Sequence, residues 1–143
     1  MNKKIAFRKL VAIFLLLICT LTVSVACSTT KTSNQTKAKD ELAKLRATKL
    51  YAEKEVEIGD NNFSPQFLEV EPNTLVIWTN KGIAIHDVMD DKTATNIMDS
   101  ENLKSGDIYF AVFTEEGVYG YHCHFHGGPK FGQYGTVTVK AKE

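Results

Sequence analysis

The stretch Gly120-Tyr-His-Cys-His-Phe-His-Gly-Gly128 contains three of the four histidines of this 143-residue chain and one of its three cysteines. Side chains alternate between the two faces of a β-strand, so Tyr121 and Cys123 are expected on one face. The bulk of the tyrosine predicts that this face lies in the core. His122 and His124 then point away from the core, and the strand is expected to end at Cys123.

Cys123 has no partner for a disulfide in the expected folded part, because the other cysteine left after removal of an N-terminal signal, Cys27, precedes that part. Exported domains usually pair their cysteines, and a lone thiol is open to oxidation unless a metal holds it. His126, just past the strand, can turn back to share one ion with Cys123, and His86 can join from a distant segment. Two imidazoles, one thiolate and a weak axial group are typical of type 1 copper. We therefore expect one copper per chain.

Short alternating segments separated by turn residues dominate the chain from residue 55 onward. Many short strands with turns every eight to twelve residues are typical of an all-β sandwich or barrel. No phosphate-binding glycine loop or internal repeat is present. We expect strands at residues 55–59, 67–71, 74–80, 108–114, 118–123 and 135–140.

The N-terminus predicts export. Basic residues precede an apolar run at residues 10–18, and small residues follow, which is typical of a secretory signal at residues 1–26. The run is short for a membrane span, although an uncleaved anchor is the alternative. Residues 24–27, Ser-Val-Ala-Cys, resemble a bacterial lipobox with serine in place of the usual leucine, and predict lipidation of Cys27. Simple cleavage before an unmodified Cys27 is the other interpretation.

The rest of the chain has two parts of opposite net charge. Residues 27–52 form a predicted polar tether, helical in composition at residues 38–52, with six basic and two acidic residues, net +4. Residues 53–143, the predicted folded domain, have seven basic and fifteen acidic residues, net −8. An acidic domain argues against nucleic-acid binding and favours basic protein partners. We expect an exported protein at the periplasmic or outer face of the cell membrane, held there by lipid.

Both halves of the folded part resemble plastocyanin-like cupredoxins over about residues 55–140. The resemblance implies a Greek-key β-sandwich that holds one type 1 copper through His86, Cys123 and His126. It also implies single-electron transfer rather than catalysis. The motifs that carry it are Phe63-x-Pro65-x-x-Leu68-x-Val70-x-Pro72, Val76-x-Trp78-x-Asn80, His86-x-Val88, Leu103-Lys-x-Gly106, Gly117-x-Tyr119-x-Tyr121-x-Cys123-x-x-His126 and Gly132-Gln-Tyr-Gly135-Thr-Val.

The axial ligand departs from the family pattern. The family usually supplies a methionine shortly after the second histidine, but the last methionine of this chain is Met98. The equivalent position is Gln133. An amide oxygen is a harder donor than a thioether, so an axial Gln133 should favour Cu(II) and lower the reduction potential. The alternative is a solvent-exposed Gln133 beside a three-coordinate copper.

His122 and His124 have two interpretations. Histidines that flank a copper cysteine resemble multicopper oxidases, and a trimer sharing a second metal through these residues would be an oligomeric copper oxidoreductase. A monomer in which both histidines are structural is the simpler interpretation. In that case Asp87, next to His86, is expected to accept a hydrogen bond from His124 and so tie the two ligand segments together.

These patterns predict a carrier of single electrons between redox partners outside the cytoplasm, such as a cytochrome, an oxidase or a reductase, and not an enzyme. A copper-binding or delivery module is the alternative. The resemblance to the family implies that electrons enter at His126 through an apolar patch, with Ile85 more suited to the core than the other candidates. These candidates are Phe125, Pro129, Phe131, Ile83 and Ile85.

Overall fold

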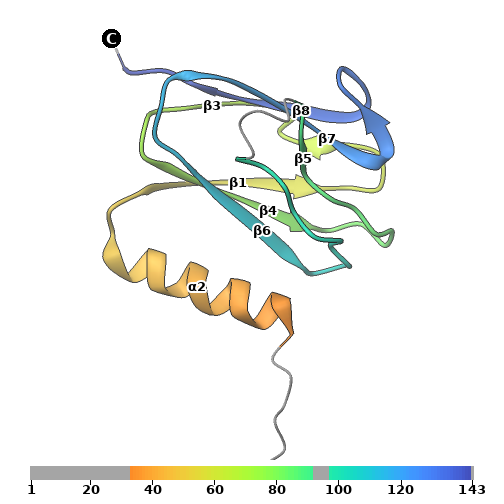
Figure 1. The fold of residues 1–143 in the computed structure, drawn as a ribbon, viewed down its shortest axis with the longest axis horizontal. Coiled ribbons are helices and arrows are strands. Elements are labelled where there is room, and N and C mark those ends of the chain that lie inside the picture. Colours follow the sequence, from red (N-terminus) through yellow and green to blue (C-terminus); the bar gives the residue numbers. More distant parts are fainter. Residues whose placement is uncertain (1–32, 92–96, 143) are drawn as a thin grey trace, which may run out of the picture. The chain divides into compact units, whose positions relative to one another are not determined.

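The computed structural model describes residues 33–91 and 97–142 of the chain (Figure 1). The predicted signal at residues 1–26 and the predicted lipidation site Cys27 lie outside the described residues. The described elements are α2 (Asn34–Thr48), β1 (Ala52–Ile58), β2 (Phe63–Ser64), β3 (Phe67–Val70), β4 (Thr74–Asn80), β5 (Met89–Asp90), β6 (Ile108–Phe113), β7 (Gly117–Gly128) and β8 (Phe131–Val139).

Two four-stranded sheets face each other (Figure 1). One sheet has the order β2-β1-β4-β6 and the other β3-β8-β7-β5. β1 pairs in parallel with β4, and β3 pairs in parallel with β8, so strands distant in sequence become neighbours. The expected β-sandwich is confirmed. Its core centres on Trp78 of β4 and Tyr121 of β7, whose rings meet edge to face at 5.4 Å.

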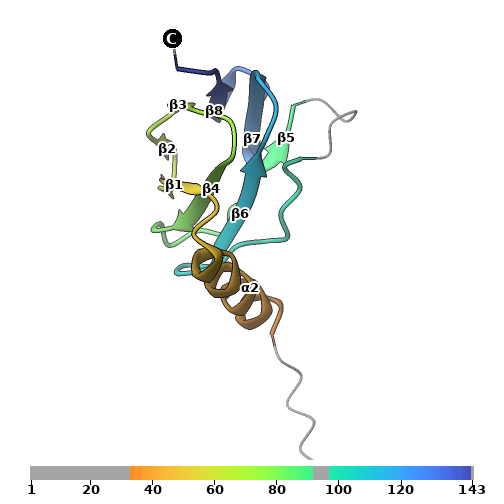
Figure 2. The same ribbon diagram turned by 90° about the vertical axis from the view of Figure 1, so that its left-hand side faces the viewer.

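β4 is buried on both of its faces. Val76 and Trp78 point into the sandwich, whereas Leu75 and Ile77 point outward and pack against Leu42 of α2. Figure 2 shows α2 running along the side of the molecule that carries β1, β4 and β6. Burial of a leucine side chain stabilises a fold by about 1.5–3 kcal/mol, so this contact fastens the helix to the sheet.

α2 begins and ends at identifiable signals. The Ser33 side chain accepts a hydrogen bond from Thr36 N, and Lys49 leaves the helix with a φ of 54°. The helix therefore spans Asn34–Thr48 rather than the expected residues 38–52. It belongs to the same unit as the sandwich, Thr32–Glu143, although the sequence assigned it to a tether. Within the described residues, no helix has both the length and the apolar character needed to cross a bilayer.

The β7–β8 hairpin differs from expectation at its tip. β7 continues to Gly128 instead of ending at Cys123, and its register with β8 shifts between His122 and Gly127. Pairing resumes because Gly127 lies directly against β8, where a Cβ atom would stand 2.5 Å from Gln133 N. The apparent end of the strand is therefore a bulge within a longer strand.

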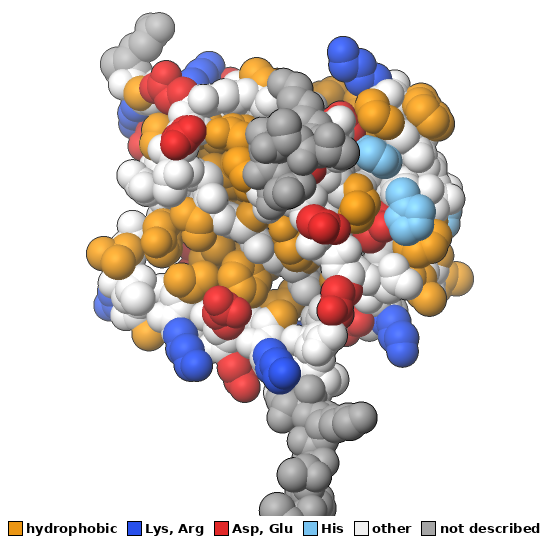
Figure 3. All heavy atoms as spheres, viewed as in Figure 1, with side chains coloured by type: hydrophobic (Ala, Val, Ile, Leu, Met, Phe, Trp, Pro, Cys, Tyr) orange, Lys and Arg blue, Asp and Glu red, His pale blue; other side chains and the backbone are white. Residues whose placement is uncertain are grey.

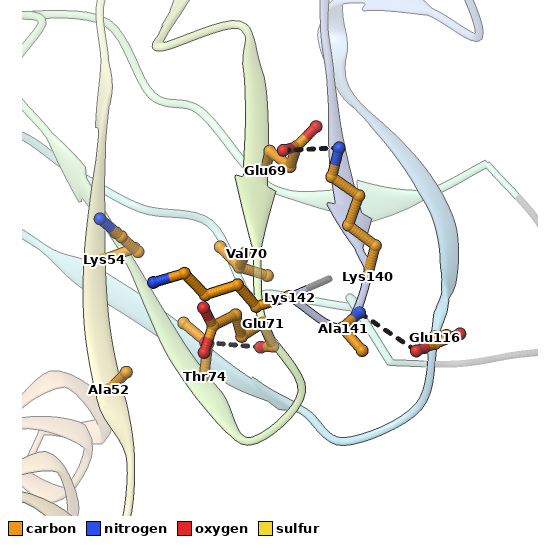
Figure 4. Close-up of a pocket in the computed structure, with 10 residues that line it drawn as sticks. All are labelled: Ala52, Lys54, Glu69, Val70, Glu71, Thr74, Glu116, Lys140, Ala141 and Lys142. Carbon is orange, nitrogen blue, oxygen red and sulfur yellow. Dashed lines mark hydrogen bonds and ion pairs between the residues drawn. The ribbon is translucent and has the colours of Figure 1, made fainter.

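The opposite end of the sandwich carries a pocket of about 850 Å³ (Figure 4). It lies where β1 and β4 begin and where β3 and β8 end, and Glu69 and Lys140 form an ion pair of 2.8 Å at its edge. Its charged lining residues are Lys54, Glu69, Glu71, Glu116, Lys140 and Lys142. None of them was predicted to bind a metal, and the pocket stands apart from the candidate site.

Candidate metal centre

His86, Cys123 and His126 come together at one end of the sandwich. One potential ligand atom from each side chain lies within 4.8 Å of the others. Cys123 Sγ is 3.7 Å from His86 Nδ1 and 3.4 Å from His126 Nδ1. The three predicted ligand residues therefore converge on one point through one sulfur and two ring nitrogens.

Three local features place these side chains. Cys123 is on the inward face of β7, two residues after the buried Tyr121. His86 follows β4 and is fixed by two backbone hydrogen bonds to Leu103, of 3.1 and 2.8 Å. His126 lies in the part of β7 where the register shifts, and the bulge turns it back toward Cys123.

Gln133 lies beside the same three residues. Its Oε1 is 2.9 Å from His86 Nδ1, and its Nε2 donates to the carbonyls of Gly59 (2.7 Å) and Asn62 (3.1 Å). The side chain is 1% exposed, which rules out the alternative of a solvent-exposed glutamine. A buried amide oxygen therefore faces the predicted ligands at close range.

Asp60 was not recognised from the sequence. Its Oδ1 is 3.5 Å from His86 Nε2 and accepts hydrogen bonds from Ile83 N (2.8 Å) and Ala84 N (3.0 Å). The N–H groups of Ala84 and then Ile83, together with His86, hold the pKa of this carboxyl below its ordinary value despite some desolvation. The available signal was an acidic side chain just before Asn61-Asn62, a pair of residues typical of turns.

Burial raises the pKa of the Cys123 thiol above its ordinary value. The thiol consequently keeps its proton at neutral pH in the metal-free protein. A metal ion that binds there must displace this proton, because the thiolate is the ligand form.

The donor set fits copper. Cysteine and histidine are suited to copper, and an amide oxygen is one of the weak axial donors found in type 1 sites. When His86 Nε2 carries its proton toward Asp60, His86 Nδ1 and Gln133 Oε1 both present lone pairs, 2.9 Å apart, to the same region. Such a pair of acceptors suits a shared cation. Structural zinc prefers four closed nitrogen and sulfur ligands and is a poorer match.

Asp87 connects the two ligand segments. It is 2% exposed, and its carboxylate accepts hydrogen bonds from the backbone N–H of His124 (2.9 Å) and from the His124 ring. The hydrogen bond expected between these residues is thus present. His122, on the same outward face of β7, pairs separately with Asp91 at 2.7 Å. Among the described residues, the one group of three potential metal ligands is the His86 cluster.

Apolar side chains reach the surface near this end of the molecule. Ile83 is 91% exposed and Phe131 65% exposed, and Phe125 and His126 are also exposed. Ile85 is 44% exposed, so its expected place in the core is wrong. In Figure 3 the visible histidine side chains lie beside hydrophobic and acidic ones.

Comparison with known proteins gives concordant matches. Residues 50–140 match the copper binding proteins of the plastocyanin/azurin family. The purple cupredoxin from Nitrosopumilus maritimus is 32% identical and superposes with a TM-score of 0.52, over 60% of this chain and 98% of that one. The reduced state of an amicyanin variant is 27% identical, with a TM-score of 0.51, over 60% of this chain and 80% of that one. A methionine-to-glutamine variant of amicyanin in its Cu(I) form is 26% identical, with a TM-score of 0.51, over 66% and 89%.

Proposed function

We propose a specific role for this chain, which belongs to the plastocyanin/azurin family of copper-binding proteins. The family and the cluster of His86, Cys123 and His126 make it a copper-binding electron-transfer protein with one copper per chain. We propose that these three side chains are the copper ligands and that Gln133 is the axial ligand. The observation that carries this assignment is the convergence of four donor atoms at one largely buried point.

A bound copper would supply a reversible one-electron couple. The protein's part is to hold the same ligands in both oxidation states, so that little rearrangement accompanies electron transfer. His86 and Cys123 are fully buried, and Gln133 is pinned to two backbone carbonyls. This rigidity supports a carrier, because the ligand positions are set by the fold.

Electrons are proposed to enter and leave through His126. This residue is exposed, and its ring lies 4.6 Å from that of buried His86, between the interior and the surface. The exposed side chains of Ile83, Phe125 and Phe131 form an apolar surface suited to brief contact with a redox protein. The net negative charge of residues 53–143 favours a partner with a basic face.

The proposed setting is outside the cytoplasm. The basic and apolar pattern of residues 1–26 supports export, and the Ser-Val-Ala-Cys sequence supports lipid attachment at Cys27. Labelling of the whole chain with a radioactive fatty acid tests this, since Cys27→Ala should abolish incorporation. Labelling that persists in that variant would contradict lipid attachment at Cys27.

Metal reconstitution tests the function directly. The protein should take up one copper per chain, show intense thiolate-to-copper absorption as Cu(II), and cycle reversibly by one electron. Tight Cu(I) binding without that absorption would favour copper delivery instead. A colourless Cu(II) protein would contradict the assignment, and more than one copper per chain in a trimer would favour the oligomeric oxidoreductase.

A further inference from the structure

The turn at residues 59–62 contacts two of the four proposed ligands. It follows β1 and is closed by a hydrogen bond of 2.9 Å from Gly59 N to Asn62 O. Gln133 and His86 both lie against it, one through the turn's backbone and the other through the side chain of Asp60. Neither Gln133 nor His86 is near this turn in sequence, so the contacts exist only in the folded chain.

The backbone of the turn fixes the direction of the Gln133 amide. A glutamine amide has N–H donors at one end and an acceptor oxygen at the other. The carbonyls of Gly59 and Asn62 can only accept, so the nitrogen must face them, at 2.7 and 3.1 Å. The oxygen consequently faces the opposite way, toward His86 Nδ1. The turn thereby selects which end of the amide points to the ligand cluster.

The side chain of the turn acts on His86. Asp60 Oδ1 is held by the N–H groups of Ile83 and Ala84 and lies 3.5 Å from His86 Nε2, at the long limit of a hydrogen bond. A proton kept on Nε2 leaves the lone pair of Nδ1 facing Cys123. The Asp60 carboxylate packs closely against Gly82, where an added Cβ atom would overlap it.

We propose that the turn at residues 59–62 is a positioning device for the metal site, which orients the axial amide through the carbonyls of Gly59 and Asn62 and the buried histidine through Asp60. This inference rests on the proposed copper function, because it concerns ligands of that metal. The turn therefore favours an amide at position 133. A side chain without N–H donors there would remove the Gln133 hydrogen bonds to both carbonyls and leave the Asn62 carbonyl with only its bond from Gly59 N.

The contacts can be tested without metal. In the metal-free protein Gln133→Glu should lower the melting temperature, because a carboxylate oxygen would face the Gly59 and Asn62 carbonyls. The matched control is Gln35→Glu in the first turn of α2, where the amide uses its oxygen to accept from Ile108 N. Glutamate keeps that oxygen and suits a helix N-terminus, so the control should melt like the wild type. Equal melting of Gln133→Glu and wild type would overturn the proposal for Gln133.

The effect on the metal is a separate test. Asp60→Ala and Gly82→Ala should each weaken Cu(II) binding by about 10- to 100-fold and alter the electron paramagnetic resonance spectrum. Asp60→Asn retains an acceptor for Ile83 and Ala84 and should change less. Glu116→Gln, at the far end of the sandwich, removes a carboxylate as a control and should change neither. Wild-type affinity and spectrum in Asp60→Ala would overturn the role of Asp60.

The two failures are distinguishable. If the wild type showed no thiolate-to-copper absorption, the proposed function would fail, and the metal-free melting comparison would still decide whether the turn holds Gln133. If the wild type bound copper as expected and both sets of variants behaved like it, the positioning role alone would be wrong.

Discussion

His86 and His126 present the same ring nitrogen, Nδ1, to Cys123, yet the protein holds them in opposite ways. His86 is completely buried, and its two ring nitrogens contact Gln133 and Asp60. His126 is exposed, and its Nδ1 lies 3.4 Å from Cys123 Sγ. His86 is therefore held inside the site by its neighbours, whereas His126 lies between the site and solvent.

The difference teaches how one small site serves two requirements. The ligands must be held still while the oxidation state changes, and an electron must still reach a partner. In the proposed function, burial and hydrogen bonding at His86 would serve the first requirement, and exposure at His126 among apolar side chains would serve the second. Each of the following predictions tests one side of this division.

Loss of Cys123 should have the largest effect, because it is the residue that both histidines share. Cys123→Ala should abolish the thiolate-to-copper absorption. Copper affinity should fall by more than the roughly 10- to 100-fold that follows loss of a supporting partner. Titration with Cu(II) followed by visible absorption measures both. If the variant kept the absorption, Cys123 would not be a copper ligand.

Removal of each histidine should separate their roles. His86→Gly and His126→Gly should both lose the native spectrum, but added imidazole should restore it only in His126→Gly. The reason is access, since the space left at position 126 opens to solvent and that at position 86 is enclosed. Visible spectra with increasing imidazole provide the measurement. Equal restoration in both variants would contradict the comparison.

Gln133→Met should change both the reduction potential of the bound copper and the stability of the metal-free protein. The thioether is a weaker axial donor for Cu(II), so the reduction potential should rise. The metal-free protein should lose about 1–3 kcal/mol of unfolding free energy, because the carbonyls of Gly59 and Asn62 lose the hydrogen bonds from Gln133 Nε2. Voltammetry and chemical denaturation test the two effects. An unchanged reduction potential would show that Gln133 is not the axial ligand.

Asp87→Ala should loosen the link between the segments that carry His86 and Cys123. Two hydrogen bonds to His124 are lost, so copper affinity should fall by about tenfold and the spectrum should shift. Asp91→Ala is the matched control, since it removes the carboxylate partner of outward-facing His122. If Asp87→Ala and Asp91→Ala left affinity, spectrum and potential equally unchanged, the link would have no role.

Ile83→Ser should have the smallest effect, and only on the side of His126. The spectrum and potential should stay the same, whereas the rate of electron exchange with a basic cytochrome should fall by less than about tenfold. Stopped-flow absorption measures this rate. Val118→Ser changes another exposed apolar residue, at the start of β7, and serves as the control. Equal rates in wild type and Ile83→Ser would place the contact surface elsewhere.

Local patterns predicted much of the fold and the meeting of the predicted ligands. β4 spans Thr74–Asn80 as expected, because β-branched and aromatic residues bounded by turn signals define it. Alternation along β7 placed Tyr121 and Cys123 in the core. The convergence of His86, Cys123 and His126 followed from spacing and from family resemblance.

Features that depend on distant contacts were missed. The bulge in β7 reflects its pairing with β8, and the role of Asp60 depends on a turn that packs against segments far along the chain. The exposure of Ile85 was misjudged because its apolar side chain alone was taken to predict burial, whereas Ile85 is 44% exposed beside the buried His86. The helix at Asn34–Thr48 was placed four residues late because the cap at Ser33 was not recognised.

The packing of α2 on β4 also affects how the protein can be shortened. A chain begun at residue 53 would lack Leu42 and leave Leu75 and Ile77 of the outer sheet face uncovered. Exposed apolar strips of this kind promote self-association and precipitation. The helix thus keeps these apolar side chains out of solvent. A soluble fragment should therefore include Ser33 and the whole of α2.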